Sequence, residues 1–159
     1  MNRKSETVLW LHNIRSIHNV GSIFRTADAA GVSKIFLVGT TPAPVDRFGR
    51  TRRDLAKVAL GAQNYVKWES AKSAGALLAR LKHEKFKIIA VEQSPKAIDY
   101  KKVKAGGKTC FVFGSEVGGL PKSILSKADI IAEIPMRGKK ESLNVSVAAG
   151  IALYGILKI

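Results

Sequence analysis

Short apolar runs recur along the chain and alternate with segments of helical periodicity. Each run lies between small polar residues, glycine or proline, and its length is that of a buried strand rather than a helix. Because strands that alternate with helices usually pair in parallel, the pattern predicts an α/β domain with a mostly parallel sheet. The predicted strands are residues 7–11, 34–39, 65–68, 87–92, 109–113 and 130–134.

Three helices are predicted between these strands from apolar spacing and end signals. Asn19 is a candidate N-cap and Gly31 a candidate C′ residue, which leaves room for about three helical turns between them. Residues 70–84 carry apolar side chains at helical spacing. A further helix is expected to begin near Pro121, and Glu116 is a candidate to cap it.

The last predicted helix, residues 143–158, is apolar on almost every side. Such a helix is buried on several sides or shared with a partner chain. Ser142 is its candidate N-cap, and Asn144 lies beside it at the start of the helix. Free N–H groups at a helix start carry partial positive charge, so this position can hold a ligand. A capped core helix without a ligand is the alternative.

Three strand ends predict one binding pocket. Val91, Phe113 and Ile134 each precede a loop. Ligands of parallel sheets bind at the carboxyl ends of strands, so these ends are expected to form the walls of a single small-molecule pocket. Residues 114–120 contain three glycines directly after a strand, which indicates a backbone that turns sharply or lies against a ligand. Ordinary turn glycines are the alternative interpretation.

The charge of the chain indicates a polyanionic partner. Lys and Arg number 27 against 12 acidic residues, for a formal net charge of +15. An excess of this size is typical of proteins that bind RNA or DNA. No apolar run approaches the ~20 residues of a membrane span, so a membrane partner is not expected. Residues 1–6 lack an apolar signal core, which predicts a cytoplasmic protein, and the length of 159 residues predicts one domain, 1–159.

Basic residues gather in three segments. Residues 40–57 form the main irregular stretch, where Phe48 lies among several arginines. Guanidinium groups beside an exposed aromatic ring suit phosphate contact and base stacking, although a solvated basic loop is an equal alternative. The candidate RNA-binding residues are Arg47, Arg50, Arg52, Arg53, Lys101, Lys102, Lys139 and Lys140.

Several common chemistries lack their residues. The three histidines, His12, His18 and His83, have no cysteine or carboxylate cluster at metal-ligand spacing, so no metal site is predicted. His12 and His18 are interpreted as polar loop residues near the first predicted helix. Cys110 is the single cysteine, which excludes an internal disulfide and predicts a buried core thiol. No sequence pattern for a covalent nucleophile is present.

Three segments together resemble a known family. They are Asn19-Val-Gly-Ser-Ile-Phe-Arg25, Phe113-Gly-Ser-Glu-Val-Gly-Gly-Leu120 and residues 134–148. In this order they resemble the three motifs of the SpoU (TrmH) family of RNA ribose 2′-O-methyltransferases, in the SPOUT superfamily. The second motif commonly has asparagine where this chain has Ser115. Serine is also small and polar, so activity is expected to survive.

The resemblance implies a fold, a cofactor and partners. The implied fold is a mostly parallel sheet flanked by helices, with a deep C-terminal trefoil knot. The implied cofactor is S-adenosyl-L-methionine, and the implied acceptor is a ribose 2′-hydroxyl in tRNA or rRNA. A homodimer through the C-terminal helix and knot region is also implied. Many relatives carry an additional RNA-binding domain, and because this chain has none, its single domain is expected to hold the RNA itself.

The resemblance also implies site residues. Arg25 matches the essential arginine of the family, but a guanidinium has a pKa above ~12 and is a poor proton acceptor. We therefore expect Arg25 to hold the phosphate beside the target ribose and to stabilise developing alkoxide charge. The implied catalytic residues are Arg25, Asn19, Glu116, Ser142 and Asn144, and the implied cofactor-binding residues are Val91, Glu92, Gly114, Ile134, Met136 and Leu143.

Two other functions fit parts of the same pattern. A non-catalytic RNA-binding module on this scaffold would explain the basic segments without cofactor binding. A nucleotide-binding α/β protein of another class would explain the strand-end pocket without a knot. Binding of S-adenosyl-L-methionine separates the first alternative from a methyltransferase, and the path of the C-terminal segment separates the second.

Overall fold

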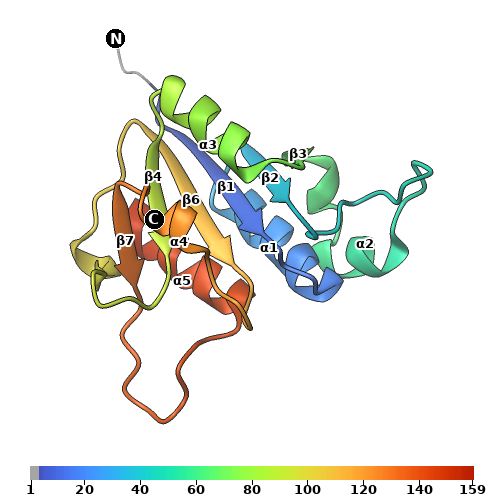
Figure 1. The fold of residues 1–159 in the computed structure, drawn as a ribbon. Coiled ribbons are helices and arrows are strands. Elements are labelled where there is room, and N and C mark those ends of the chain that lie inside the picture. The colour runs from blue at the N-terminus through green and yellow to red at the C-terminus, as the bar shows by residue number, and fades with distance from the viewer. Residues whose placement is uncertain (1–3) are drawn as a thin grey trace.

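A seven-stranded sheet forms the centre of the computed structural model, which describes residues 4–159 (Figure 1). Residues 1–3, at the start of the N-terminal stretch considered above, lie outside the described residues. The strand order is β3-β2-β1-β6-β4-β7-β5, and each pair of neighbouring strands is parallel. The parallel α/β prediction is therefore confirmed. The strands are β1 (Glu6–His12), β2 (Lys34–Val38), β3 (Lys67–Ala71), β4 (Lys87–Val91), β5 (Ile98–Asp99), β6 (Lys108–Gly114) and β7 (Ile130–Glu133).

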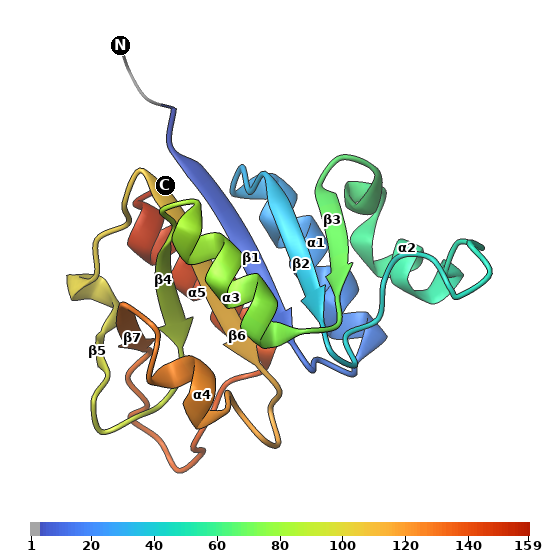
Figure 2. The same ribbon diagram turned by 45° about the horizontal axis from the view of Figure 1, so that its top comes forward.

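Helices cover both faces of the sheet, so the domain has three layers (Figure 2). Successive strand residues point to opposite faces, which divides the core in two. Leu9 and Leu11 pack with one group of helices, and Val8 and Trp10 pack with the other. The first group is α1 (Ile17–Ala29), α2 (Arg53–Ala59) and α5 (Val145–Leu157), and the second is α3 (Ala74–His83) and α4 (Lys122–Leu125).

Two helices begin at residues other than the predicted caps. Ser16 caps α1, because its hydroxyl accepts the N–H of Asn19 at 3.2 Å, and the helix begins one turn earlier than predicted. Asn144 caps α5 in place of Ser142, since its side-chain oxygen accepts the N–H of Ser146 at 2.9 Å. Both errors have one cause: adjacent polar residues are all competent caps, and tertiary contacts select among them.

Three other predictions needed correction. The predicted helix 70–84 begins only at Ala74, because the residues before it extend edge strand β3. The end of the predicted irregular segment 40–57 is helical in α2. Glu116 does not cap α4, which has Pro121 at its N-cap position and no side-chain cap. The short strand β5 and the 3₁₀ helices η1 (Ala62–Asn64) and η2 (Tyr100–Lys102) were not predicted, because each is too short for a periodic pattern.

The buried thiol prediction is confirmed. Cys110 lies in β6 with no exposed surface, and burial raises the pKa of its thiol far above the usual value. It therefore behaves as a small apolar side chain of the core. Within residues 4–159, no helix combines the length and apolar character required to cross a bilayer.

A charged cluster attaches α3 to the outer strands. Glu69 on β3 accepts hydrogen bonds from Lys34 at 2.6 Å and from Arg80 at 2.7 Å. These bonds lower the pKa of Glu69 to about 2, with the Arg80 hydrogen bond as the largest cause. A carboxylate whose pKa is lowered by folding stabilises the fold above its unfolded value near 4.5, and this contribution disappears as the pH falls toward 2.

We expect Glu69→Gln to lower stability at pH 7 by about 1 kcal/mol, because solvent screens a cluster this exposed. The loss should shrink steadily as the pH falls from 5 to 2. Glu84→Gln is the matched control, since among the described residues the Glu84 carboxylate pairs with Arg80 alone, at 3.3 Å. Urea unfolding at several pH values measures both variants. Equal losses at pH 7 and pH 2.5 would contradict a carboxylate of lowered pKa at position 69.

Candidate functional site

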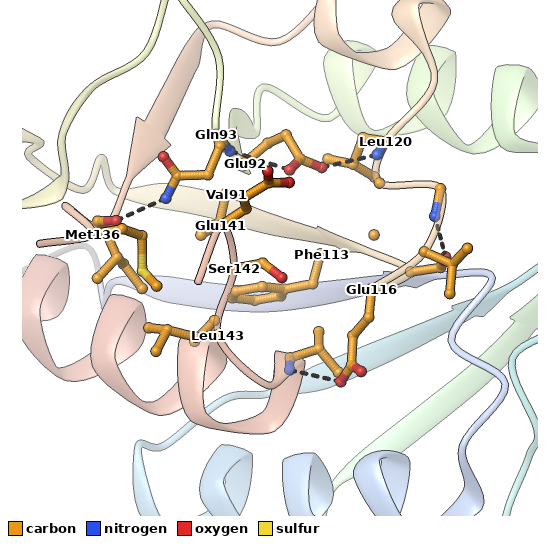
Figure 3. Close-up of a pocket in the computed structure, with 18 of the residues that line it drawn as sticks. Val91, Glu92, Gln93, Phe113, Glu116, Leu120, Met136, Glu141, Ser142 and Leu143 are labelled. Atoms are coloured by element: carbon orange, nitrogen blue, oxygen red, sulfur yellow. Dashed lines mark hydrogen bonds between the residues drawn. The ribbon is translucent and has the colours of Figure 1, made fainter. Parts of the chain in front are cut away.

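The carboxyl ends of β4, β6 and β7 surround a cavity of about 460 Å³ (Figure 3). Val91, Phe113 and Ile134 lie in its wall, as the strand-end pattern predicted. The loop before α5 closes another side. The cavity is also lined by all six residues predicted to bind the cofactor: Val91, Glu92, Gly114, Ile134, Met136 and Leu143.

Glycine is required where the β6 loop closes on itself. A Cβ atom on Gly114 would lie 2.6 Å from the carbonyl carbon of Gly119 and 2.8 Å from its oxygen. Real Cβ atoms do not approach backbone this closely, so any side chain at position 114 displaces the loop. Gly119 has a φ of +61°, in the left-handed region that favours glycine. The sharp turn that the glycines indicated is therefore present in this loop.

Glu92 and Gln93 connect the three loops of the cavity. The Glu92 carboxylate accepts the N–H of Leu120 at 2.9 Å, which fixes the end of the β6 loop. The side-chain amide of Gln93 donates to the carbonyl of Ile134 at 2.8 Å, which fixes the loop after β7. Gln93 was missed in the sequence because it belongs to no motif and precedes an ordinary turn.

Three carboxylates face this cavity, in a chain that is otherwise strongly basic. They belong to Glu92, Glu116 and Glu141. Cations are attracted to a pocket lined in this way, and anions are disfavoured. The cavity is therefore suited to a ligand of mixed polarity that carries positive charge.

A hydrogen-bond network joins the three sequence motifs at the edge of the cavity. The Asn19 amide donates to Glu116 Oε1 at 3.1 Å, and the same oxygen accepts the N–H of Val145 at 3.1 Å. The Asn144 amide donates to Asn19 Oδ1, also at 3.1 Å. Residues 97 to 125 positions apart in sequence thus meet at one point. Ser142 lines the cavity without belonging to this network.

Arg25 lies apart from the cavity. It is exposed on α1 and lines a shallow groove with Val58 of α2 and Tyr154 of α5. Among the described residues it forms no ion pair. The family resemblance placed Arg25 among the site residues. Within one chain, however, Arg25 does not line the strand-end cavity.

The arginine-rich segment is an ordered hairpin rather than an irregular loop. The Asp46 carboxylate accepts the N–H groups of Phe48 and Arg50 and the Arg50 guanidinium, and the backbone hydrogen bond from Arg50 is the largest cause that lowers the pKa of Asp46. Phe48 remains 66% exposed, with Arg47 4.7 Å from its ring centre. Arg53 is exposed in the first turn of α2, and Arg52 is half-buried.

The other basic residues lie elsewhere on the molecule. Lys139 and Lys140 are exposed in the long loop between β7 and α5 (Figure 1), directly before Glu141, which lines the cavity. Lys101 and Lys102 lie on η2, which packs against the C-terminal part of α5 at Gly155. A helix rises 1.5 Å per residue, so η2 is about 15 Å from the helix start at the cavity.

A second cavity of about 600 Å³ lies on the other side of the β6 loop. Its walls include the end of β1, the start of α1, and Glu116 and Val145, which also line the first cavity. The interpretation of His12 as a polar loop residue was wrong: it ends β1, is only 8% exposed, and lines this second cavity. His18 is exposed in the first turn of α1.

The described part of the chain offers no candidate metal site. Within residues 4–159, no three His, Cys, Asp or Glu side chains gather as metal ligands would.

Known proteins share both the sequence and the fold of this chain. The model of the SpoU rRNA Methylase family matches residues 6–154. The tRNA (guanosine(18)-2′-O)-methyltransferase of Escherichia coli (strain K12) is 32% identical over 152 residues, which cover 96% of this chain and 63% of that protein. The chain thus spans less than two thirds of this curated relative.

Solved structures give the same result. The AdoMet-bound rRNA methyltransferase of Sinorhizobium meliloti is similar with a TM-score of 0.86 and 28% identity, over 98% of this chain and 57% of that one. A structure described as giving insights into the 2-OH methylation of C/U34 on tRNA is similar with a TM-score of 0.82 and 25% identity, over 97% and 95% of the two chains. Because the family match covers nearly all of the described residues, the chain belongs to the SpoU rRNA methylase family.

Proposed function

We propose that this protein transfers a methyl group from S-adenosyl-L-methionine to a ribose 2′-hydroxyl in tRNA or rRNA. The observation that carries the proposal is the meeting of Asn19, Glu116 and Asn144 at the edge of the strand-end cavity. The relatives add support: one is named for 2′-O-methylation of guanosine 18 in tRNA, and another was solved with AdoMet.

The residues around the first cavity fit this cofactor. A volume of about 460 Å³ lies within the ~300–1,000 Å³ typical of ligand pockets. The Glu92, Glu116 and Glu141 carboxylates favour a ligand with a sulfonium and an ammonium group. Gly114 leaves space that a side chain would fill. We assign the holding of the cofactor to Val91, Glu92, Gly114, Ile134, Met136 and Leu143.

The bound cofactor supplies an electrophilic methyl group and its leaving group. The remaining task for the protein is to place a ribose hydroxyl in line with that methyl group. We assign this orientation to Asn19, Glu116, Ser142 and Asn144. Hydrogen bonds from Asn19 to Glu116 and from Asn144 to Asn19 fix these three side chains before substrate arrives. Arg25 holds the neighbouring phosphate and stabilises charge that develops on the ribose oxygen.

We propose that the protein acts as a homodimer through α5 and the adjoining C-terminal segment. Two large apolar side chains of α5 remain exposed, Val147 at 49% and Tyr154 at 40%. Tyr154 also lies in the groove beside Arg25. Since Arg25 is outside the cavity of its own chain, its proposed role requires a second copy that brings Arg25 to the first.

The proposal includes a C-terminal trefoil knot and a single domain that holds RNA in the cytoplasm. In support of the knot, β7 lies between β4 and β5, which both precede it in sequence, and α5 then returns to the face of α1. In support of RNA contact by this domain, the Asp46-ordered hairpin presents Phe48 and several arginines, and the exposed Lys139 and Lys140 directly precede Glu141 of the cavity wall.

The double variant Arg47→Ala/Arg53→Ala is expected to weaken RNA binding and its salt dependence. Each lost phosphate contact lowers the slope of log K against log salt by about 0.7–0.9, so the slope should fall by about 1.5. Lys82→Ala/Lys127→Ala removes the same charge from the α3 and α4 face and is the matched control. Filter binding of tRNA at several salt concentrations measures both slopes. Equal slopes for the two variants would remove the hairpin from the RNA interface.

Calorimetry with S-adenosyl-L-methionine tests the proposed function against a non-catalytic RNA-binding module. The methyltransferase requires saturable binding with one site per chain or per dimer. Salt-sensitive RNA binding with no heat from the cofactor would support the RNA-binding module instead.

A further inference from the structure

The second cavity shares part of its wall with the first. Ser115, Glu116, Gly118, Gly119 and Val145 line both, so the β6 loop is a thin partition between the two spaces. The second space, about 600 Å³, lies at the carboxyl ends of β1 and β6, where the strand order changes direction. Parallel sheets bind ligands at such a point. A ligand here lies directly beside whatever occupies the first cavity.

His12 presents an unused hydrogen-bond donor to this second cavity. The Trp10 indole N–H donates to His12 Nδ1 at 3.4 Å, so the neutral ring carries its proton on Nε2. That nitrogen has no hydrogen-bond partner among the described residues, although the side chain is more than nine-tenths buried. Burial also lowers the pKa of His12, which keeps the ring neutral. Because the His12 side chain lines the cavity, a ligand there can accept the hydrogen bond that Nε2–H offers.

The start of α1 supplies positive charge at the entrance of the same cavity. Arg15 is exposed, and the N–H groups of Ile17 and His18 have no acceptor within residues 4–159. A helix of 13 residues with no acidic residue in its first turn attracts an anion such as phosphate at this end. A phosphate bound here would place the rest of a nucleotide within reach of His12.

The loop that carries these groups is rigid. Asn13 has a φ of +53°, a strained value for a residue other than glycine. Its side chain accepts the N–H of Thr40 at 3.0 Å, and the Thr41 hydroxyl accepts the N–H of Ile14 at 3.0 Å. These bonds fix residues 13–16 to the turn after β2. A preorganised loop at a cavity entrance is typical of a binding site.

We infer that the second cavity binds the acceptor nucleotide of the RNA, with its base against His12 Nε2–H and its phosphate at Arg15 and the start of α1. This inference rests on the proposed methyl transfer, because the ribose then lies at the partition, where Glu116 faces both cavities. His12 contributes to base recognition, since an N–H donor accepts only bases that present an acceptor atom to it.

Nuclear magnetic resonance of the histidine rings tests binding directly. The four ribonucleoside 5′-monophosphates are added one at a time to protein saturated with S-adenosyl-L-methionine. At least one should shift the His12 signal while the exposed His83 signal stays in place and the cofactor remains bound. Variants of His18 and His83 assign the exposed rings and leave His12 by elimination. The inference is wrong if no nucleotide shifts His12, or if the shift requires loss of the cofactor.

Kinetics of His12→Gln and Arg15→Ala provide the second readout, with His83→Gln as the matched control. Both variants should lower kcat/KM for RNA by about tenfold or more, the value of one lost hydrogen bond of about 1.4 kcal/mol. Their affinity for S-adenosyl-L-methionine should equal that of the wild type. If the wild type methylates RNA and both variants have the same kcat/KM as the wild type, the inferred nucleotide site is wrong and the proposed function stands. A wild type that methylates no RNA would instead refute the proposed function, while the nucleotide titration would still report on the cavity.

Discussion

Replacing Arg25 by alanine is expected to lower methyl-transfer turnover by about 10²- to 10³-fold, the usual effect of removing one group that stabilises transition-state charge. The affinity for S-adenosyl-L-methionine should be nearly unchanged, because Arg25 does not line the cofactor cavity. Folding should also be unaffected, since the side chain is exposed and forms no ion pair with the described residues. Single-turnover kinetics with excess enzyme measure the chemical step.

Arg25→Lys is the informative companion variant. Lysine keeps the charge but loses the planar pair of donors that grips a phosphate, so only partial activity should return. Full activity in Arg25→Ala would remove this residue from the proposed site. Full activity in Arg25→Lys would show that charge alone suffices.

Mixed dimers test whether Arg25 acts on the cavity of a second copy. Inactive Arg25→Ala protein, refolded together with a variant whose cofactor cavity is blocked, forms some dimers with one intact arginine and one intact cavity. If a working site combines the arginine of one chain with the cavity of the other chain, activity returns. If Arg25 acts within its own chain, the mixed dimers stay inactive, and the assignment of Arg25 to the cavity of a second copy is contradicted.

The Gly114→Ala substitution is expected to raise the Kd for S-adenosyl-L-methionine by about 10- to 100-fold, equal to the 1–3 kcal/mol usual for overpacking. The new Cβ would lie 2.6 Å from backbone of Gly119, so the loop has to move, and it moves at the wall of the cavity. Glu92 holds the same loop at Leu120, which leaves little freedom to adjust. Calorimetry measures the affinity.

Gly107→Ala, just before β6, is the matched control. A Cβ there meets no atom within 4 Å, the residue has no positive φ, and it lines neither cavity. Its cofactor affinity should equal that of the wild type. Two variants with the same affinity would show that the close approach at Gly114 has no role in binding, and thermal melting identifies any loss that is due to unfolding alone.

Local patterns in the sequence predicted the sheet and the strand-end cavity well, for identifiable reasons. Parallel strands buried on both faces read as continuous apolar runs, so six of the seven strands were found. Ligand loops follow strand ends in this architecture, which is why Val91, Phe113 and Ile134 predicted one shared wall. The turn that contains Gly114 and Gly119 was also recognisable in the sequence. A close backbone approach and a positive φ leave few alternatives to glycine at these positions.

Features that depend on contacts between distant residues were not predictable from sequence alone. Asn19 and Ser142 looked like helix caps, but Ser16 and Asn144 are the caps, and the Asn19 and Asn144 side chains bond one another in the network around Glu116. His12 looked like a loop residue because only the register of β1 shows that it is buried. The separation of Arg25 from the cavity depends on how α1 packs against α5, which no single motif encodes.

The most direct test of the central claim follows a labelled methyl group. Purified protein is incubated with S-adenosyl-L-methionine that carries a trideuterated methyl group and with total RNA from cells that lack the gene, and the digested nucleosides are analysed by mass spectrometry. Methyl transfer to a ribose 2′-hydroxyl predicts the label in the sugar fragment of one nucleoside. Label confined to a base fragment, or absent from all RNA although the cofactor binds, would contradict it.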